Sequence, residues 1–382
     1  MPVGASARVH LVTAGTPPDS PFTGTGQWIW YVSRSGSDAA AIASKAKAHG
    51  ITTVFVKSGD GGTYWPQFDQ IVGPLKAQGI KVCAWQFVYA RRPRRQAKIA
   101  IRAIRSGADC FVVDAESSFE GGHYAAARAY MKKIRLVVGL SYPIGLSSFP
   151  YVDYHPSFPY SAFFEPPYGA QFNLPQVYWR AIGTPVTTAM DHTYLWNNIY
   201  ATPIAPTAGT WLGESKTELK DFRQDAVLNG SPGVSYWNWQ ETRPWQWSAF
   251  SAPLDPSLSQ NVLPVKYPKL AVGSKGDAVV WAQTQLNEWG YLVRSSGYFR
   301  QATADAVRGF QTDHNLPITG ELDATTWAEL LKPPTQASAH RPHGGGGVVG
   351  NKASVTARAL RSEPASSRLP ALDYEVPQLR SK

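Results

Sequence analysis

The sequence predicts a (β/α)8 barrel followed by a small all-α domain of three helices and a disordered tail. Three observations support this prediction. A helix-ending glycine followed by an apolar run occurs three times, the same alternation continues to about residue 250, and a helical repeat follows it. Alternating strands and helices are typical of a parallel sheet, and roughly 225 residues suffice for eight such units. An open doubly wound sheet is the alternative, but no GxGxxG or P-loop motif favours it.

The threefold repeat is the clearest of these signals. Its copies are HGITTVFVKSGDG, QGIKVCAWQFVYA and SGADCFVVDAESS, which contain Gly50, Gly79 and Gly107. Glycine is favoured just after a helix because it readily adopts a left-handed backbone conformation. Each copy then enters a short run of β-branched and aromatic residues, which is typical of a strand. The helices expected around these strands span 38–49, 65–78 and 93–106.

The alternation continues along the rest of the first block. Further strands are expected at 27–33, 137–143, 172–179, 203–211 and 233–240. Further helices are expected at 123–134, 186–199 and 216–229. With the three strands of the repeat, this makes eight strands. We therefore expect an N-terminal extension over 1–26, a barrel over 27–250 and a linker, rich in Pro and Ser, over 251–266.

Two carboxylates close one of the repeated strands. Counting seven residues from each helix-ending glycine reaches Lys57, Gln86 and Asp114. If the neighbouring strands share one register, these polar side chains lie at one level, on the C-terminal rim where barrel active sites occur. Glu116 follows two residues later and should share the face of Asp114. We expect both carboxylates in the barrel mouth, because an isolated charged carboxylate is costly in a packed core.

The same counting bears on the two cysteines. Cys83 stands four residues after its glycine and Cys110 three residues after its own. Neighbouring strands would then point the two side chains to opposite faces of the sheet. We therefore expect two buried free thiols rather than a disulfide.

The second block, residues 267–333, contains two similar segments, DAVVWAQ (277–283) and DAVRGFQ (305–311), and a third helix that begins near Asp323. Through GSKGDAV, GYF and TGELDATTW it resembles the peptidoglycan-binding domain of the three-helix type. Arg300 stands where that family usually has glycine, which affects one turn. The resemblance implies that this block binds peptidoglycan without cutting it. From residue 334 the chain is rich in Gly, Pro, Ala and Ser, so we expect 334–382 to be disordered.

Several common wall-cutting chemistries lack their residues in this sequence. The eight histidines include no HExxH or HxH, and no GxSxG motif is present. Both cysteines lie inside predicted strands, where a catalytic cysteine is not expected. We therefore expect no metal and no cofactor. Glycoside cleavage remains, because it needs only carboxylates and a groove shaped for sugars.

A second resemblance concerns the barrel. VFVKSGDGGTYWPQFDQ, VCAWQF and CFVVDAES resemble the second, third and fourth strands of glycosyl hydrolase family 25, the barrel lysozymes. The resemblance implies Glu116 as the general acid and Asp114 as its charged helper. That family also carries an aspartate on its first strand, whereas QWIWYVS has none. Carboxylates that follow other predicted strands and are candidates to replace it are Asp60, Glu165, Glu214 and Glu241.

Further side chains on the predicted rim are candidates for sugar binding. Besides Lys57 and Gln86, the amides among them are Gln176, Asn238 and Gln240, and the aromatic residues are Tyr142, Tyr178, Trp211, Trp237 and Trp239. Along the last strand, alternation places Asn238 and Gln240 on one face and the two tryptophans on the other. We expect the amides to point into the mouth and the indoles toward the helices.

The formal net charge of +10 attracts polyanions but does not choose among nucleic acid, anionic lipid and the bacterial envelope. The run RRPRR (91–95) is interpreted as the solvated start of a helix rather than an envelope contact. No apolar run is long enough to span a membrane, and the N-terminus is a poor secretion signal.

The sequence therefore predicts a monomeric peptidoglycan hydrolase of lysozyme type at the bacterial cell wall, or a phage lysin or virion component. Nucleic acid is not expected as a partner. The alternative is a non-catalytic peptidoglycan-binding protein whose barrel has lost its chemistry.

Overall fold

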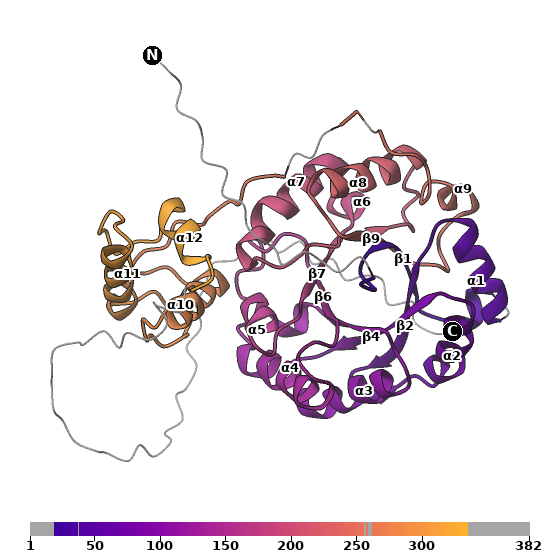
Figure 1. Cartoon of the computed structure of the whole chain (residues 1–382), viewed down its shortest axis with the longest axis horizontal. Coiled ribbons are helices and arrows are strands. Elements are labelled where there is room, and N and C mark those ends of the chain that lie inside the picture. The colour runs from indigo at the N-terminus through magenta and orange to yellow at the C-terminus, as the bar shows by residue number, and fades with distance from the viewer. Residues whose placement is uncertain (1–18, 37, 256, 259–261, 335–382) are drawn as a thin grey trace.

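The computed structural model describes residues 19–36, 38–255, 257–258 and 262–334. Two predicted segments lie largely outside these described residues. They are the disordered tail, from residue 335 on, and the N-terminal extension, up to residue 18. Eight parallel strands form the barrel, and β1 pairs with both β2 and β9, which closes it (Figure 1). The barrel strands are β1 (Gly24–Ile29), β2 (Thr53–Asp60), β4 (Lys81–Val88), β5 (Cys110–Ala115), β6 (Ile144–Ser148), β7 (Phe172–Val177), β8 (Thr207–Gly209) and β9 (Gly233–Trp237).

Helices surround the barrel, and a short antiparallel strand, β3 (Thr63–Tyr64), extends β2 at the rim. The helices of this block are α1 (Ala39–Ala48), α2 (Gln67–Ala77), α3 (Pro93–Arg105), α4 (Tyr124–Val138), α5 (Tyr160–Phe164), α6 (Trp179–Ile182), α7 (Val186–Asn197), α8 (Lys216–Leu228) and α9 (Pro244–Trp247). The predicted barrel is thus confirmed. Among the described residues, no helix is both long and apolar enough to cross a membrane.

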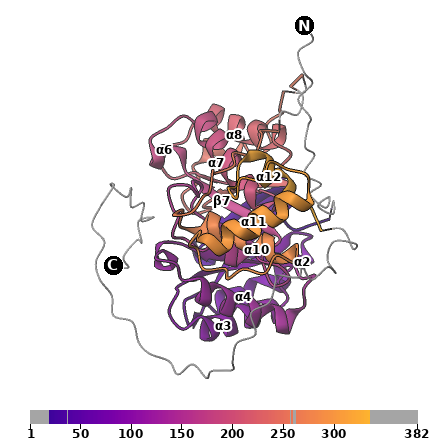
Figure 2. The same ribbon diagram turned by 90° about the vertical axis from the view of Figure 1, so that its left-hand side faces the viewer.

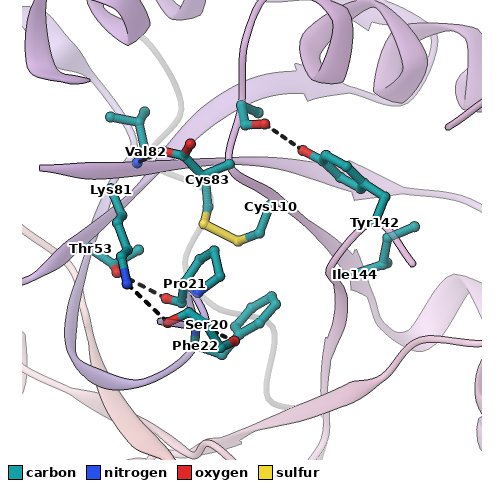
Figure 3. The surroundings of a disulfide bond; sticks show 12 residues. Ser20, Pro21, Phe22, Thr53, Lys81, Val82, Cys83, Cys110, Tyr142 and Ile144 are labelled. Carbon is teal, nitrogen blue, oxygen red and sulfur yellow. Dashed lines mark hydrogen bonds between the residues drawn. A yellow bond between two sulfur atoms is a disulfide. The ribbon is translucent and has the colours of Figure 1, made fainter. Parts of the chain in front are cut away.

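One predicted strand was wrong. Residues 137–143 were expected to be extended, but α4 continues to Val138 and β6 begins only at Ile144. The apolar run that suggested a strand instead ends a helix and forms a loop, where Leu136 and Leu140 are exposed. This shift also moves Tyr142 from the rim to the opposite end of the barrel. There its hydroxyl donates to the carbonyl of Ala108 (Figure 3).

The predicted register between the repeated strands was wrong by one residue. Lys57 pairs with Trp85, and Asp114 pairs with Phe87, so Gln86 lies on the other face of β4. A shift of one residue reverses the face of every side chain on a strand. The distance from the helix-ending glycine therefore does not measure the level in the barrel: Lys57 and Asp114 stand equally far from their glycines, yet their partners on β4, Trp85 and Phe87, are two residues apart.

The same error separated the cysteines. Cys83 pairs directly with Cys110 across β4 and β5, and the two form a disulfide inside the barrel (Figure 3). The expectation of two free thiols was therefore wrong. Neither side chain is exposed, and both belong to the apolar core that fills the barrel interior with Trp28, Phe55 and Trp85.

The C-terminal block folds into three helices, α10 (Asp277–Glu288), α11 (Gln301–Asp313) and α12 (Ala324–Leu330). The repeat in its sequence has a structural cause. Gln283 and Gln311 are the last residues of the two similar segments, and both are buried. The side-chain oxygen Oε1 of each accepts hydrogen bonds from two backbone amides of the loop that follows its helix. Their amide groups donate to further oxygens in the same loops. Each glutamine thus fixes the turn after its helix.

This three-helix domain packs against the side of the barrel, beside α5 and α7, and leaves the end of the barrel uncovered (Figures 1 and 2). Asp277, at the start of α10, is buried at the contact. Its carboxylate accepts from the backbone and hydroxyl of Ser161 and from the hydroxyl of Tyr200. The indole of Trp281 donates to the carbonyl of Ile199. Hydrogen bonds of buried groups therefore tie the two domains together.

The pH dependence of this contact can be predicted. Burial raises the pKa of the Asp277 carboxyl to about 6, although the hydrogen bonds from Ser161 and Tyr200 lower it. The folded state therefore binds the proton more tightly than the unfolded state. The stabilisation is complete below about pH 4 and is lost as the pH rises through about 6.

We expect Asp277→Asn to remove this dependence, so that the difference in unfolding free energy between the two proteins changes by about 2–3 kcal/mol between acid and neutral pH. Urea unfolding of both proteins across this range measures it. Parallel pH profiles would contradict the assignment.

Candidate active site

A cavity of about 280 Å³ opens at the C-terminal end of the barrel strands. It is lined by Trp28, Trp30, Lys57, Trp85, Phe87, Tyr89, Asp114, Glu116, Ser117, Ser118, Ser147, Gln176, Tyr178 and Trp237. The two predicted carboxylates are in this group, together with four of the candidate sugar-binding residues: Lys57, Gln176, Tyr178 and Trp237. Aromatic side chains and a few polar groups that face one another are typical of a ligand pocket.

The carboxylates meet at a single amide. Nε2 of Gln176 donates to Oδ1 of Asp114 at 3.0 Å and to Oε1 of Glu116 at 3.1 Å. It also lies 3.2 Å from Oγ of Ser147. Asp114 is the penultimate residue of β5, which is buried along its whole length, whereas Glu116 follows the strand and is only half-buried. Gln176 thus orients both carboxylates toward the cavity.

Burial raises the pKa of Asp114 well above its ordinary value, and the charges of Glu116 and Asp60 raise it further. The charge of Lys57 and the hydrogen bond from Gln176 act in the opposite direction. Two close carboxylates titrate as a coupled pair, in which the first charge disfavours the second. The site can therefore keep one proton at a pH where an exposed aspartate is fully charged.

The ammonium group of Lys57 is buried and already paired, so it is not free to bind a sugar. Its Nζ lies 2.9 Å from Oδ2 of Asp60 and 4.5–4.9 Å from the ring centres of Trp30, Trp65 and Trp85. Contacts between a cation and aromatic faces stabilise an ammonium group that has lost water. Lys57 therefore holds Asp60 at the cavity and places a positive charge near Asp114.

The indole rings form the inner wall of the cavity. Trp28, Trp85 and Trp237 pack edge-to-face, with ring centres 5.3–5.7 Å apart, and Trp30 lies against Trp85 and Trp237. At the side, Tyr178 meets Trp211 edge-on. Such rigid aromatic surfaces suit the apolar faces of sugar rings.

Six of the candidate sugar-binding residues do not line the cavity: Gln86, Tyr142, Trp211, Asn238, Trp239 and Gln240. Gln86 points outward, where its amide donates to the carbonyl of Gly61 and its oxygen accepts from the hydroxyl of Tyr130. Tyr142 lies at the other end of the barrel. Asn238 is buried and bonds to Glu241, and Gln240 donates to the carbonyl of Tyr31 and to Ser35. These contacts hold loops in place.

The orientation expected for the last strand was also wrong. Trp237 lines the cavity, whereas Trp239 packs outward against Trp247. The alternation used for this prediction holds only within a strand, and β9 ends at Trp237.

The structure also separates the four candidate second carboxylates. Asp60 interacts with Asp114 and accepts from Tyr89, whose hydroxyl lies 3.2 Å away. Glu165 instead pairs with Arg128, Glu214 accepts from the amide of Leu212, and Glu241 accepts from Asn238. Of the four, Asp60 is the one that adjoins the carboxylate pair.

Several lining residues were not predicted, above all Trp28, Trp30, Trp85 and Phe87. They occupy alternate positions of β1 and β4 and the residue after β1, so a period of two was present in the sequence. It does not tell which face of the strand points inward. Among the described residues, no group of three or more His, Cys, Asp or Glu side chains is placed to hold a metal ion.

Residues 275–330 match the family model described as "Putative peptidoglycan binding domain". This agrees with the resemblance noted for the three-helix domain. Among curated proteins, no sequence matches this chain. One similar solved structure is a fused Zn-dependent amidase/peptidase/peptidoglycan-binding domain-containing protein from Clostridium acetobutylicum. The matched region is 36% identical, covers 19% of this chain and 33% of that one, and has a TM-score of 0.19.

Two examples of the solved structures that match this chain each cover 60% of it. The class V chitinase of Nicotiana tobaccum is 10% identical over 60% of this chain and 97% of its own, with a TM-score of 0.43. The spore cortex-lytic enzyme SleL of Bacillus cereus is 11% identical over 60% of this chain and 73% of its own, with a TM-score of 0.46. Because these TM-scores are below 0.5, neither similarity bears on the reaction.

Proposed function

We propose that this chain is a glycoside hydrolase that cuts the glycan of peptidoglycan, with the C-terminal domain holding the barrel on its substrate. The observation that carries the proposal is the pair Asp114 and Glu116, bridged by Gln176 in a cavity walled by indole rings. The match of residues 275–330 to a peptidoglycan-binding model supports the choice of substrate. The site of action is then the bacterial cell wall, whether the protein comes from the host or from a phage. The buried disulfide fits such an oxidising location.

In this proposal Glu116 is the general acid, because it is the more exposed member of the pair. It donates its proton to the glycosidic oxygen while the bond between that oxygen and the anomeric carbon breaks. Water then adds its hydroxyl group to the anomeric carbon and returns its other proton to Glu116. Asp114 shares the proton before the reaction and supports the positive charge that develops on the sugar. Asp60, fixed by Lys57, is a further carboxylate whose charge acts on Asp114.

The sugar would lie on the indole wall formed by Trp30, Trp85 and Trp237, with Tyr178 at its side. The disulfide lies deeper in the barrel interior, and in this proposal substrate enters from the end of the barrel where the cavity opens. The three-helix domain leaves this end uncovered.

A second candidate is a wall-binding protein without catalysis. It is favoured by the first strand, which supplies Trp28 and Trp30 to the cavity and no carboxylate. The same experiment decides between the two. Purified full-length protein is incubated with insoluble peptidoglycan, the pellet is removed, and the supernatant is analysed by mass spectrometry. New muropeptides with reducing ends support the hydrolase and identify the bond. If the protein is found in the pellet and no soluble fragments appear, the chain is a wall-binding protein without catalysis.

A further inference from the structure

The barrel carries an exceptional concentration of positive charge on α3 and α4, two helices that pack against each other at one edge of the barrel (Figures 1 and 2). Together they contain nine Lys and Arg residues and no Asp or Glu. Like charges four residues apart on a helix are destabilising, and Arg94 and Lys98, Lys98 and Arg102, and Arg128 and Lys132 stand at this spacing. This face therefore departs from an ordinary solvated surface.

Three of the nine cations have a structural role. Arg102 pairs with Asp69, Arg128 pairs with Glu165, and the buried Arg135 donates to carbonyl oxygens of the loop after α4. Within the part of the chain that the structure describes, no ion pair is formed by the other six, which are Arg94, Arg95, Lys98, Arg105, Lys132 and Lys133. Their charge is available to a partner.

A groove of about 550 Å³ lies between the C-terminal halves of the two helices. Its walls are Lys98, Ile101, Arg102, Arg105, Ser106, Lys133 and Val137. Four cations thus face one hollow, on a scale that fits a phosphate group and the chain attached to it. Guanidinium and ammonium groups are the usual ligands for phosphate in proteins.

Apolar side chains protrude beside this groove. Leu136 is 64% exposed, Val137 37% and Leu140 51%, at the end of α4 and in the loop that follows. Single exposed apolar residues are common, but three within five positions, next to unpaired cations, form a mixed surface. A soluble polyanion would use the cations and leave the leucines in water. The surface of a bilayer with anionic lipids uses both.

The position of this surface leaves the rest of the protein free to act. In a (β/α)8 barrel the C-terminal ends of the helices lie at the end opposite the active site. The groove residues also do not overlap with Ser161 and Tyr200, which hold the three-helix domain. A membrane contact here would turn the cavity away from the lipid.

We propose that the α3–α4 face is a docking site for the surface of a membrane that contains anionic phospholipids. Lys98, Arg105 and Lys133 contact the lipid phosphates, and Leu136 and Leu140 enter the boundary between headgroups and acyl chains. The protein lies on the bilayer and does not span it. This proposal does not depend on the reaction proposed for the barrel.

Vesicle co-sedimentation of the full chain tests the proposal. We expect binding to phosphatidylcholine vesicles that contain phosphatidylglycerol, little binding to phosphatidylcholine alone, and a loss of binding as NaCl is raised. The variant Lys98→Glu/Arg105→Glu/Lys133→Glu should bind the anionic vesicles about 100-fold more weakly, because each Lys or Arg near an anionic membrane surface adds to the binding free energy and each Glu is repelled. The matched control, Lys47→Glu/Lys216→Glu/Lys220→Glu, changes the net charge equally on α1 and α8 and should bind nearly as well as the unmodified protein.

A second variant tests the apolar part. Leu136→Ser/Leu140→Ser keeps every charge and should weaken vesicle binding about 10-fold, because less apolar surface is buried. Its binding to soluble polyphosphate should be unchanged. The proposal fails if the unmodified protein does not bind the anionic vesicles. Equal losses in the two charge variants would show a non-specific effect of net charge. Polyphosphate binding of equal strength, with no effect of the leucines on vesicles, would assign the face to a soluble polyanion instead.

Discussion

Replacing Glu116 by glutamine is expected to lower the release of soluble glycan fragments by about 100-fold or more, because the proton donor is lost while the size of the side chain is kept. Binding to insoluble peptidoglycan should be unchanged, since the three-helix domain lies on the side of the barrel and contributes none of the residues that line the cavity. The rate of fragment release and the fraction of protein in the pellet measure the two effects separately. Urea unfolding should show that the variant is folded.

Glu165→Gln is the matched control for this experiment. Glu165, which follows α5, is also partly exposed, but it pairs with Arg128 and does not line the cavity. We expect this variant to keep its activity. If Glu116→Gln and the unmodified protein release fragments at the same rate, Glu116 is not the general acid, even if the protein is a hydrolase. Activity lost equally in both variants would indicate damage to the fold rather than to the reaction.

Removing the disulfide should produce the largest change in stability. The variant Cys83→Ala/Cys110→Ala is expected to lower the free energy of unfolding by about 3–4 kcal/mol, because the bond joins residues 27 positions apart and restricts the unfolded chain. Urea unfolding of the oxidised protein, and of both proteins with a reducing agent, measures the effect. The reduced protein should approach the stability of the variant, and the variant itself should not respond to reduction.

The disulfide also lies directly below the candidate active site. Cys110, Val112 and Asp114 are alternate residues of β5 and point into the barrel, and the bond joins β5 to β4 at the lowest of these levels. We therefore expect the variant to lose part of its activity at temperatures where it is still folded. Unchanged unfolding free energy would mean that the bond is not formed in the protein in solution.

Much of this architecture follows from local patterns in the sequence. The glycines at 50, 79 and 107 mark helix ends because the backbone there requires a left-handed conformation, and each has a positive φ in the structure. Apolar runs and periodic helices then fix the order of elements. The repeated DAV segments mark two helices whose final glutamines hold similar turns. All of these features depend on residues that are close together in the chain.

The candidate site was only partly predictable for the same reason. Asp114 and Glu116 were found because polar residues at the end of an apolar strand are unusual, whatever lies beside them. Gln86 was placed with them because it stands at the same distance from its glycine. The structure shows that it points the other way.

The sequence alone therefore determined the barrel, the three-helix domain and the carboxylate pair, because backbone conformation and apolar periodicity act over a few residues. Only the tertiary structure decided which residues meet: Cys83 with Cys110, Trp237 with the cavity, and Asp277 with the barrel. The physical reason is strand register. It is set by hydrogen bonds between strands that are distant in the chain and by the lengths of the loops between them. A shift of a single residue exchanges the inner and outer faces of a strand.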